Sequence, residues 1–445
     1  MQNYSFIGRK KITSSVPRIH SRNVINVLNA VLPIHDTNAA SIQYLQNYVR
    51  GVQPVLDREP KYANDKIKNQ IVINKAAEIT EFKTSYFLGE SGQYIANSDD
   101  PSVQENISLL NKYMASQSKS SIDQSIAYNM HTCGLGYRFI KAADDVVPFR
   151  LYSLDPYNTF VVYYSGIEGY PLMGVHRIWI NEATPVYAVW TPERYYLIQN
   201  DAISQSKPHI LGDVPIVEYV CNETRQGAFE PVLTLLDAAN ELESSRLDGV
   251  QINVQAFLKF VNCGISMDQL AEFKSKGAIM INSEPGLPSD VDYLEVKLSQ
   301  DQTQILLDDL NEKILTIVGM PSQSDGKNTD SSNNGAAIVS RGWQSADTRA
   351  KGTEKYFKVA ERRSLGIISR LMGFNDISID PKEIDIRFDR RNYADILTKA
   401  QALTTMLQSN KVAPIDAYSS VGMFPDSTGA SARGEAYFDK MRENS

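Results

Sequence analysis

The stretch VGMPSQSDGKNTDSSNNGAAIVSRG, from Val318 to Gly342, best indicates how this chain is organised. Gly319 and Pro321 interrupt a helical pattern, and the next residues, 322–334, are polar and offer nothing that a core could bury. A helical pattern resumes at Gly335. The sequence therefore predicts an exposed loop between two helices.

The two helices differ in charge. The first is predicted over residues 301–318 from its apolar spacing, and the second over residues 335–373. The second contains eight bases and three acids in a chain whose net charge is −7. Four of its bases share one face because they are spaced by four, three and four residues: Lys351, Lys355, Lys358 and Arg362. This face fits a solvated surface, a subunit interface with acidic neighbours, or transient contact with phosphates.

A further long helix is predicted before these two, over residues 229–261. Residues 277–282 (GAIMIN) and 294–298 (LEVKL) are predicted to form strands around the turn-rich EPGLPSD. The middle of the chain therefore has the order helix, small β module, helix, loop, long helix.

The N-terminal half is predicted to be a mixed lobe. Its first 35 residues carry five bases and no acid, which indicates either a partly ordered basic terminus or an arm that contacts a neighbouring subunit or nucleic acid. Helices are predicted over 72–86, with Gly89 ending that helix, and as a pair within 103–130. β-branched and aromatic runs predict strands at 137–140, 157–164, 174–180, 185–190 and 195–198.

The C-terminal part completes an α+β fold class. Residues 377–388 (ISIDPKEIDIRF) alternate between apolar and polar and are predicted to form one or two strands that return to the sheet of the first lobe. Helices are predicted over 393–407, 414–421 and 434–441.

Composition and motifs argue against an enzyme or a membrane protein. No run approaches the ~18 apolar residues that span a bilayer. The five histidines lack metal-ligand spacing, and GxxxxGK[ST], GxGxxG and GxSxG do not occur, so no cofactor, metal or catalytic residue is expected. The distant Cys133, Cys221 and Cys263 are expected to be buried free thiols. The net charge of −7 indicates that any contact with DNA is local or transient.

Several stretches in this order resemble the portal proteins of tailed bacteriophages, of the siphophage type. They are YLQNYVRGVQPVLDRE from Tyr44, the HILGDVPIVEYVCNETRQGAFEPVL segment from His209, and the stretch from Val318 quoted above. The resemblance spans roughly residues 44–392.

The resemblance implies a portal fold with seven parts. These are an α/β wing (1–228, with returning strands in 374–391), a stem helix (229–263), a small α/β clip (264–300), a second stem helix (301–321), a tunnel loop (322–334), a long wing helix (335–373) and a short helical crown (392–445).

The resemblance also implies a function. The chain would be the subunit of a ring, expected to be a dodecamer, at one vertex of the virion capsid, assembled in the host cytoplasm with major capsid and scaffolding proteins. Double-stranded DNA would pass through its channel during packaging and ejection, and the terminase large subunit and then head-completion proteins would dock at the clip. The alternative is another head–tail connector or a capsid-associated structural protein.

Three groups of residues would carry this function. Glu284 and Asp290 belong to the clip surface, and the basic face of the long helix includes Arg341 as well as the four bases named above. The tunnel loop contributes Ser322, Asp325, Gly326, Lys327, Asn328, Asp330, Asn333 and Asn334.

Overall fold

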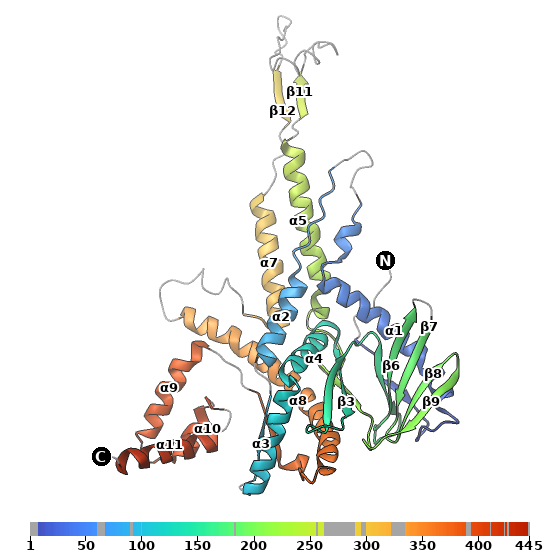
Figure 1. Cartoon of the computed structure of the whole chain (residues 1–445). Coiled ribbons are helices and arrows are strands. Elements are labelled where there is room, and N and C mark those ends of the chain that lie inside the picture. The colour runs from blue at the N-terminus through green and yellow to red at the C-terminus, as the bar shows by residue number, and fades with distance from the viewer. Residues whose placement is uncertain are drawn as a thin grey trace, which may run out of the picture. The chain divides into compact units, whose positions relative to one another are not determined.

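The computed structural model describes residues 8–59, 67–89, 92–98, 100–181, 184–254, 257–261, 290–294, 300–321, 334–388, 393–409, 411–421, 423–424 and 427–443. These residues fall into two compact units. Unit 1 comprises Met1–Arg50, Asn74–Pro231 and Ile317–Ser445, and unit 2 comprises Gly51–Ile73 and Val232–Thr316. Helices and strands are mixed throughout (Figure 1), which confirms the predicted α+β class.

One part of unit 1 is a sheet of six strands covered by a long helix. The sheet has the order β1-β5-β6-β7-β8-β9, with β1 parallel to β5 and the other neighbours antiparallel. Helix α1 (Val24–Val49) buries Val24, Leu28 and Val31 in a core shared with Phe160 and Val162 of the sheet. The strands are β1 (Ile12–Ser14), β5 (Thr159–Tyr164), β6 (Pro171–Asn181), β7 (Thr184–Trp190), β8 (Arg194–Gln199) and β9 (Ala202–Pro208).

A second core in unit 1 joins helices to a three-stranded sheet, ordered β10-β3-β4. Its helices are α2 (Lys75–Leu88), α3 (Pro101–Ser116), α4 (Lys119–Cys133) and α8 (Asn334–Gly373). Its strands are β3 (Leu135–Ala142), β4 (Phe149–Leu154) and β10 (Ile216–Val220), together with the pair β2 (Gln93–Ala96) and β13 (Ile384–Arg387).

Local sequence explains where these helices begin and end. Asp100 caps α3 by accepting a hydrogen bond from the backbone N–H of Ser102, and Pro101 occupies the first helical position. Gly134 ends α4 with a φ of +83°, the left-handed conformation that suits glycine. Three more helices, α9 (Tyr393–Leu407), α10 (Pro414–Val421) and α11 (Ser427–Glu443), follow β13.

Unit 2 is built around two long helices, α5 (Leu233–Val254) and α7 (Gln300–Val318), which lie side by side in Figure 1. Arg246 on α5 donates to the side-chain oxygen of Gln304 on α7 at 2.8 Å. The 3₁₀ helix η1 (Pro54–Asp57) contacts α5. Strand β11 (Phe257–Val261) follows α5 in the chain and forms a hairpin with β12 (Asp290–Leu294). The last two residues of α7 belong to unit 1.

The prediction of a partly ordered basic terminus is wrong for residues 8–14, whereas contact of its exposed bases with a neighbouring subunit or nucleic acid stays a prediction. Arg9 is buried and forms an ion pair with Glu230, and Ile12–Ser14 is a strand of the six-stranded sheet. A local run of bases cannot reveal a carboxylate partner 221 residues away.

Two predictions about strands also need correction. The apolar run FLKFV was assigned to the helix ending at Val261, but it forms β11, paired with Asp290–Leu294. Leu294 therefore ends a strand instead of beginning one. Residues 277–282 and 295–298 lie outside the described residues.

The strand in 377–388 does not return to the large sheet. Pro381–Glu383 is a 3₁₀ helix, and β13 pairs with β2 in a sheet of its own. The last predicted helix, 434–441, is longer in the structure, over Ser427–Glu443.

Candidate functional site

The connection from α7 to the predicted tunnel loop depends on a glycine. Gly319 has a φ of +66°, which other residues rarely adopt. A Cβ atom at this position would lie 2.3 Å from Cδ of Arg349 on α8. Glycine therefore permits both the turn and the close approach of Arg349.

Lys83, which belongs to α2, contacts the same glycine. Its Nζ donates a hydrogen bond to the carbonyl oxygen of Gly319 at 3.2 Å, where the end of α7 carries partial negative charge. Burial, and secondarily the positive charge of Arg349, lower the pKa of Lys83 to about 8. Two cations thus meet at the point where the chain leaves α7.

Three half-buried aromatic rings pack beside this point. Trp343 on α8 lies 6.1 Å from Phe82 and 5.7 Å from Tyr86, measured between ring centroids. Phe82 and Tyr86 stack in parallel on α2 at 5.8 Å. This contact attaches the first half of α8 to α2.

A buried ion pair attaches the second half of α8. The Nη1 of Arg138 on β3 lies 2.6 Å from the Oε2 of Glu361, and the hydroxyl of Tyr219 donates to the same oxygen at 2.7 Å. Burial alone would raise the pKa of the Glu361 carboxyl, but Arg138, Lys119 and the hydrogen bonds hold it at about 2. Glu361 is therefore charged throughout the neutral pH range.

Asp123 on α4 balances this group. It pairs with both Arg138 and Lys119, and the Nζ of Lys119 also lies 3.3 Å from Glu361. Two cations and two carboxylates are thus enclosed together, so the cluster is formally neutral. Opposite charges in contact offset the cost of burying each one.

The predicted basic face of α8 is only partly free. Lys351 pairs with Asp347 at 2.7 Å and Lys358 with Glu354 at 2.8 Å, each four residues earlier on the helix. Lys355 and Arg362 are exposed, and no contact described for α8 gives either one an acidic partner. The side chain of Arg341 lies outside the described residues. Whether this face contacts DNA or a neighbouring subunit stays a prediction.

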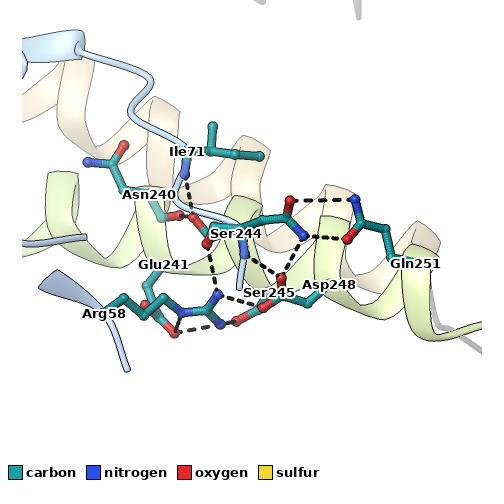
Figure 2. Close-up of polar contacts among 9 residues, drawn as sticks. Arg58, Ile71, Asn240, Glu241, Ser244, Ser245, Asp248 and Gln251 are labelled. Carbon is teal, nitrogen blue, oxygen red and sulfur yellow. Dashed lines mark hydrogen bonds and ion pairs between the residues drawn. The ribbon is translucent and has the colours of Figure 1, made fainter. Parts of the chain in front are cut away.

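In unit 2, a segment that contains η1 lies along α5. We name it the strap, residues 51–59 and 67–73. Its Arg58 bridges three side chains of α5 (Figure 2): Nε donates to Glu241 at 2.8 Å, Nη1 to Asp248 at 2.6 Å and Nη2 to Ser245 at 2.7 Å. Hydrogen bonds from Arg58 and Asn69 hold the pKa of Asp248 below its usual range, although burial opposes this.

The strap also forms a ladder with α5 through its backbone. The N–H groups of Asn69, Ile71 and Ile73 donate to three polar side chains of the helix, at distances of 2.9, 2.9 and 3.0 Å. The acceptors lie four residues apart: Asp248, Ser244 and Asn240. Ser244 is seen in Figure 2 between the other two. The strap therefore has a defined register on the helix.

Most of the predicted loop and clip residues lie outside the described residues. Of the loop residues, Asn334 is the first residue of α8, and Ser322, Asp325, Gly326, Lys327, Asn328, Asp330 and Asn333 lie outside the described residues. Glu284 also lies outside them, and Asp290 is the first residue of β12, with its side chain not described.

Sequence reasoning missed the roles of Lys83, Glu361 and the strap. One signal for the strap was available: Asn240, Ser244 and Asp248 form a polar row, spaced by four, on one side of the predicted helix. No local signal identified Lys83, because its contact with Gly319 joins residues 236 positions apart.

Among the described residues, no helix is long and apolar enough to cross a membrane. Nor does this part of the chain gather three His, Cys, Asp or Glu side chains that could hold a metal ion.

Comparison with protein families gives a match over most of the chain. Residues 28–414 match the family described as "Phage portal protein, SPP1 Gp6-like". This chain belongs to that family. The match confirms the resemblance to portal proteins that was noted from the sequence. The matched residues include α7, Gly319 and α8 of the portal protein. No curated protein matches the chain.

Solved structures similar to this portal protein include three from gene transfer agent particles. The neck of the native particle, computed with C12 symmetry, is 11% identical, with a TM-score of 0.47, covering 80% of this chain and 91% of that one. The neck of the empty particle, computed with C6 symmetry, is 13% identical, with a TM-score of 0.48 and coverages of 82% and 92%. A chain of the native virion is 12% identical, with a TM-score of 0.44 and coverages of 86% and 94%.

Proposed function

We propose that this portal protein is the subunit of a closed ring whose central channel carries double-stranded DNA into and out of a capsid. The observation that carries the proposal is the family match over residues 28–414, which includes α7, the Gly319 turn and the 40-residue helix α8. A dodecamer is the expected ring, and no catalytic step is assigned to the chain.

The ring is proposed to occupy one capsid vertex of the virion after assembly in the host cytoplasm. The terminase large subunit docks on it during packaging, and head-completion proteins replace the terminase afterwards. Major capsid and scaffolding proteins surround it. The module between α5 and α7, which contains Glu284 and Asp290, is the proposed docking surface for the motor.

The charges of α8 suit a channel in which DNA slides. Each phosphate held by Lys or Arg adds a salt-dependent term to affinity, which a moving duplex must overcome. Lys351 and Lys358 are paired within their own helix, which leaves Lys355 and Arg362 as the bases of that face that have no acidic partner among the described residues. Two bases per subunit support weak and reversible contact.

Electron microscopy of the purified protein tests this proposal. Closed rings with a central hole should form without nucleotide, metal or DNA, and sedimentation at micromolar concentration should give a ring-sized species. A stable monomer under several salt conditions would refute the ring. Rings that are incorporated into capsids but do not support DNA packaging would favour another connector role.

A further inference from the structure

We propose that Lys83 and Arg349, which both lie against Gly319 in unit 1, bind one phosphate group. Lys83 contacts the carbonyl oxygen of this glycine, and the side chain of Arg349 passes over its Cα. All three residues are described in the structure and belong to the same unit.

The first argument is an excess of positive charge. Three other cations of α8 have acidic partners, whereas the exposed Lys355 and Arg362 have none among the described residues: Lys351 has Asp347, Lys358 has Glu354, and Arg363 has Asp213 at 3.0 Å. Arg349 has no hydrogen bond or ion pair among the described residues, and Lys83 has no described carboxylate partner.

The end of α7 compensates only part of this excess. A helix C-terminus contributes about half a negative charge, so among the described residues two cations leave roughly +1.5 at this place. Cys221 is the other titratable group that acts on Lys83, and burial, above all, raises the pKa of its thiol to about 12, so that it stays neutral. An anion of charge between one and two would balance the site.

The second argument is the kind of donors present. Lys83 uses one of its three N–H groups on Gly319, and the planar guanidinium of Arg349 presents a fork that matches two oxygens of a phosphate. The hydroxyl of Ser345 lies 3.2 Å from where a Cβ of Gly319 would be. Ammonium, guanidinium and hydroxyl donors on three side chains that lie against one glycine are a set that phosphate oxygens can use.

The third argument concerns the mutual repulsion of the two cations. The charge of Arg349 disfavours the protonated form of Lys83, in addition to the effect of burial. A phosphate bound between them would reverse this effect and return Lys83 to its charged form. Ligand binding is therefore coupled to protonation of Lys83.

Two sources of phosphate fit the chemistry: a phosphodiester of DNA and free inorganic phosphate. If DNA is the source, the site deepens the proposed function by locating one backbone contact beside the start of the predicted tunnel loop, and it then rests on that function. Binding of inorganic phosphate does not depend on a ring or a channel, so the two hypotheses can fail separately.

Acylation of lysines on the purified full chain tests the site. With its pKa near 8, Lys83 is about half deprotonated at pH 8, whereas an ordinary lysine is below about 1%. Lys83 should therefore react with a small amine-reactive reagent much faster than the exposed Lys355, as measured by mass spectrometry. Inorganic phosphate should slow the labelling of Lys83 at constant ionic strength, while chloride should not.

A variant and a second ligand complete the experiment. Arg349→Gln should weaken phosphate protection by about tenfold or more, because one charge-assisted contact is lost, while Arg349→Lys should retain part of it and Lys355→Gln should leave it unchanged. Protection by a short duplex as well as by phosphate identifies DNA as a source; protection by phosphate alone identifies the free ion. If neither protects Lys83, or if protection survives in Arg349→Gln, the site is refuted.

Discussion

The guanidinium of Arg138 and the carboxylate of Glu361 lie 2.6 Å apart, and neither side chain is exposed to solvent. The first belongs to β3 and the second to α8, 223 residues later. Each group neutralises the charge of the other, and either charge would be costly to bury without its partner. This relationship fixes the second half of α8 against the three-stranded sheet.

Glu361→Gln should destabilise unit 1 strongly. The substitution leaves Arg138 buried beside a neutral amide, and breaking a buried pair in this way costs about 3–5 kcal/mol. Urea unfolding followed by circular dichroism measures the loss. The control is Lys351→Gln, which removes an exposed pair on the same helix and should cost less than about 1 kcal/mol. Equal effects of the two substitutions would contradict the assigned role of Glu361.

Stability should begin to fall below about pH 6.5, where a histidine that the fold keeps neutral begins to bind a proton in the unfolded state. Burial, and then the charge of Lys83, lower the pKa of His131 to about 3 in the folded chain, whereas an unfolded histidine titrates near 6.5. Between these values the unfolded state binds a proton that the folded state does not, so acid favours unfolding by about 2 kcal/mol at pH 5.

The His131→Gln variant checks this pH dependence. The unfolding free energy of the variant should be measured from pH 8 to pH 5. It should depend on pH less steeply than that of the parent, by the contribution of one proton, whatever its value at pH 8. Part of the slope should remain, because burial and then the charge of Arg177 also lower the pKa of His35 to about 3. A slope equal to that of the parent would show that His131 does not contribute to it. The contribution of Glu361 has a different window: its pKa is depressed to about 2, so its stabilisation is lost only as the pH falls from about 4.5 toward 2.

The strap ladder should respond to the loss of a single hydroxyl. Ser244→Ala removes the acceptor of the Ile71 N–H, so this amide should exchange with deuterium about tenfold faster. Ser245→Ala is the matched control, because its hydroxyl contacts Arg58 and not Ile71. Hydrogen exchange resolved at Ile71 measures both. If the two variants gave the same exchange rate at Ile71, the Ser244 hydroxyl would not be the group that protects this amide.

Shortening the predicted tunnel loop should separate assembly from DNA transport. Removal of residues 325–330 (DGKNTD) deletes polar residues with nothing to bury and leaves Gly319 and α8 in place. Rings should form as in the parent, while packaging or retention of DNA should be impaired. Procapsids with the shortened loop that package and hold a full genome would show that the loop is a passive connection.

Charge reversal in the predicted clip should affect docking and not assembly. Glu284→Lys together with Asp290→Lys changes the module between α5 and α7, which is proposed to face the motor. We expect rings of normal size and weaker binding of the terminase large subunit in a pull-down assay. Loss of rings with docking intact would mean that this module has been assigned the wrong role.

Periodicity predicted the long elements well and the short ones poorly. Helices α7 and α8 have apolar patterns that extend over many turns, so the expected ranges 301–318 and 335–373 agree with the structure. The five residues of FLKFV carry too few positions to distinguish a strand from the end of a helix. Their partner strand, Asp290–Leu294, is separated from them by 28 residues of chain and could not be identified locally.

Charge patterns were informative only where the partners lie on one helix. Lys351 and Lys358 pair with acids four residues earlier, as helical spacing allows. Glu361 was one of the three acids counted against the bases of that helix, yet its partner is Arg138 of a distant strand. Arg9 is a similar case, because its partner Glu230 lies 221 residues away in the sequence and is close only in the folded chain. Long-range ion pairs are a property of the tertiary fold, which sequence spacing does not encode.

The ladder between the strap and α5 has a limited length for a geometric reason. Two residues of extended chain advance by about 6.6 Å, and four residues of helix by about 6.0 Å, so each rung adds a mismatch of about 0.6 Å. Three rungs tolerate this offset, and longer ladders would exceed hydrogen-bonding range. The helix positions one turn beyond the ladder are Leu236 and Ile252, which have no acceptor. Natural variation in the length of α5 should therefore accumulate outside residues 240–248, while this window keeps its spacing.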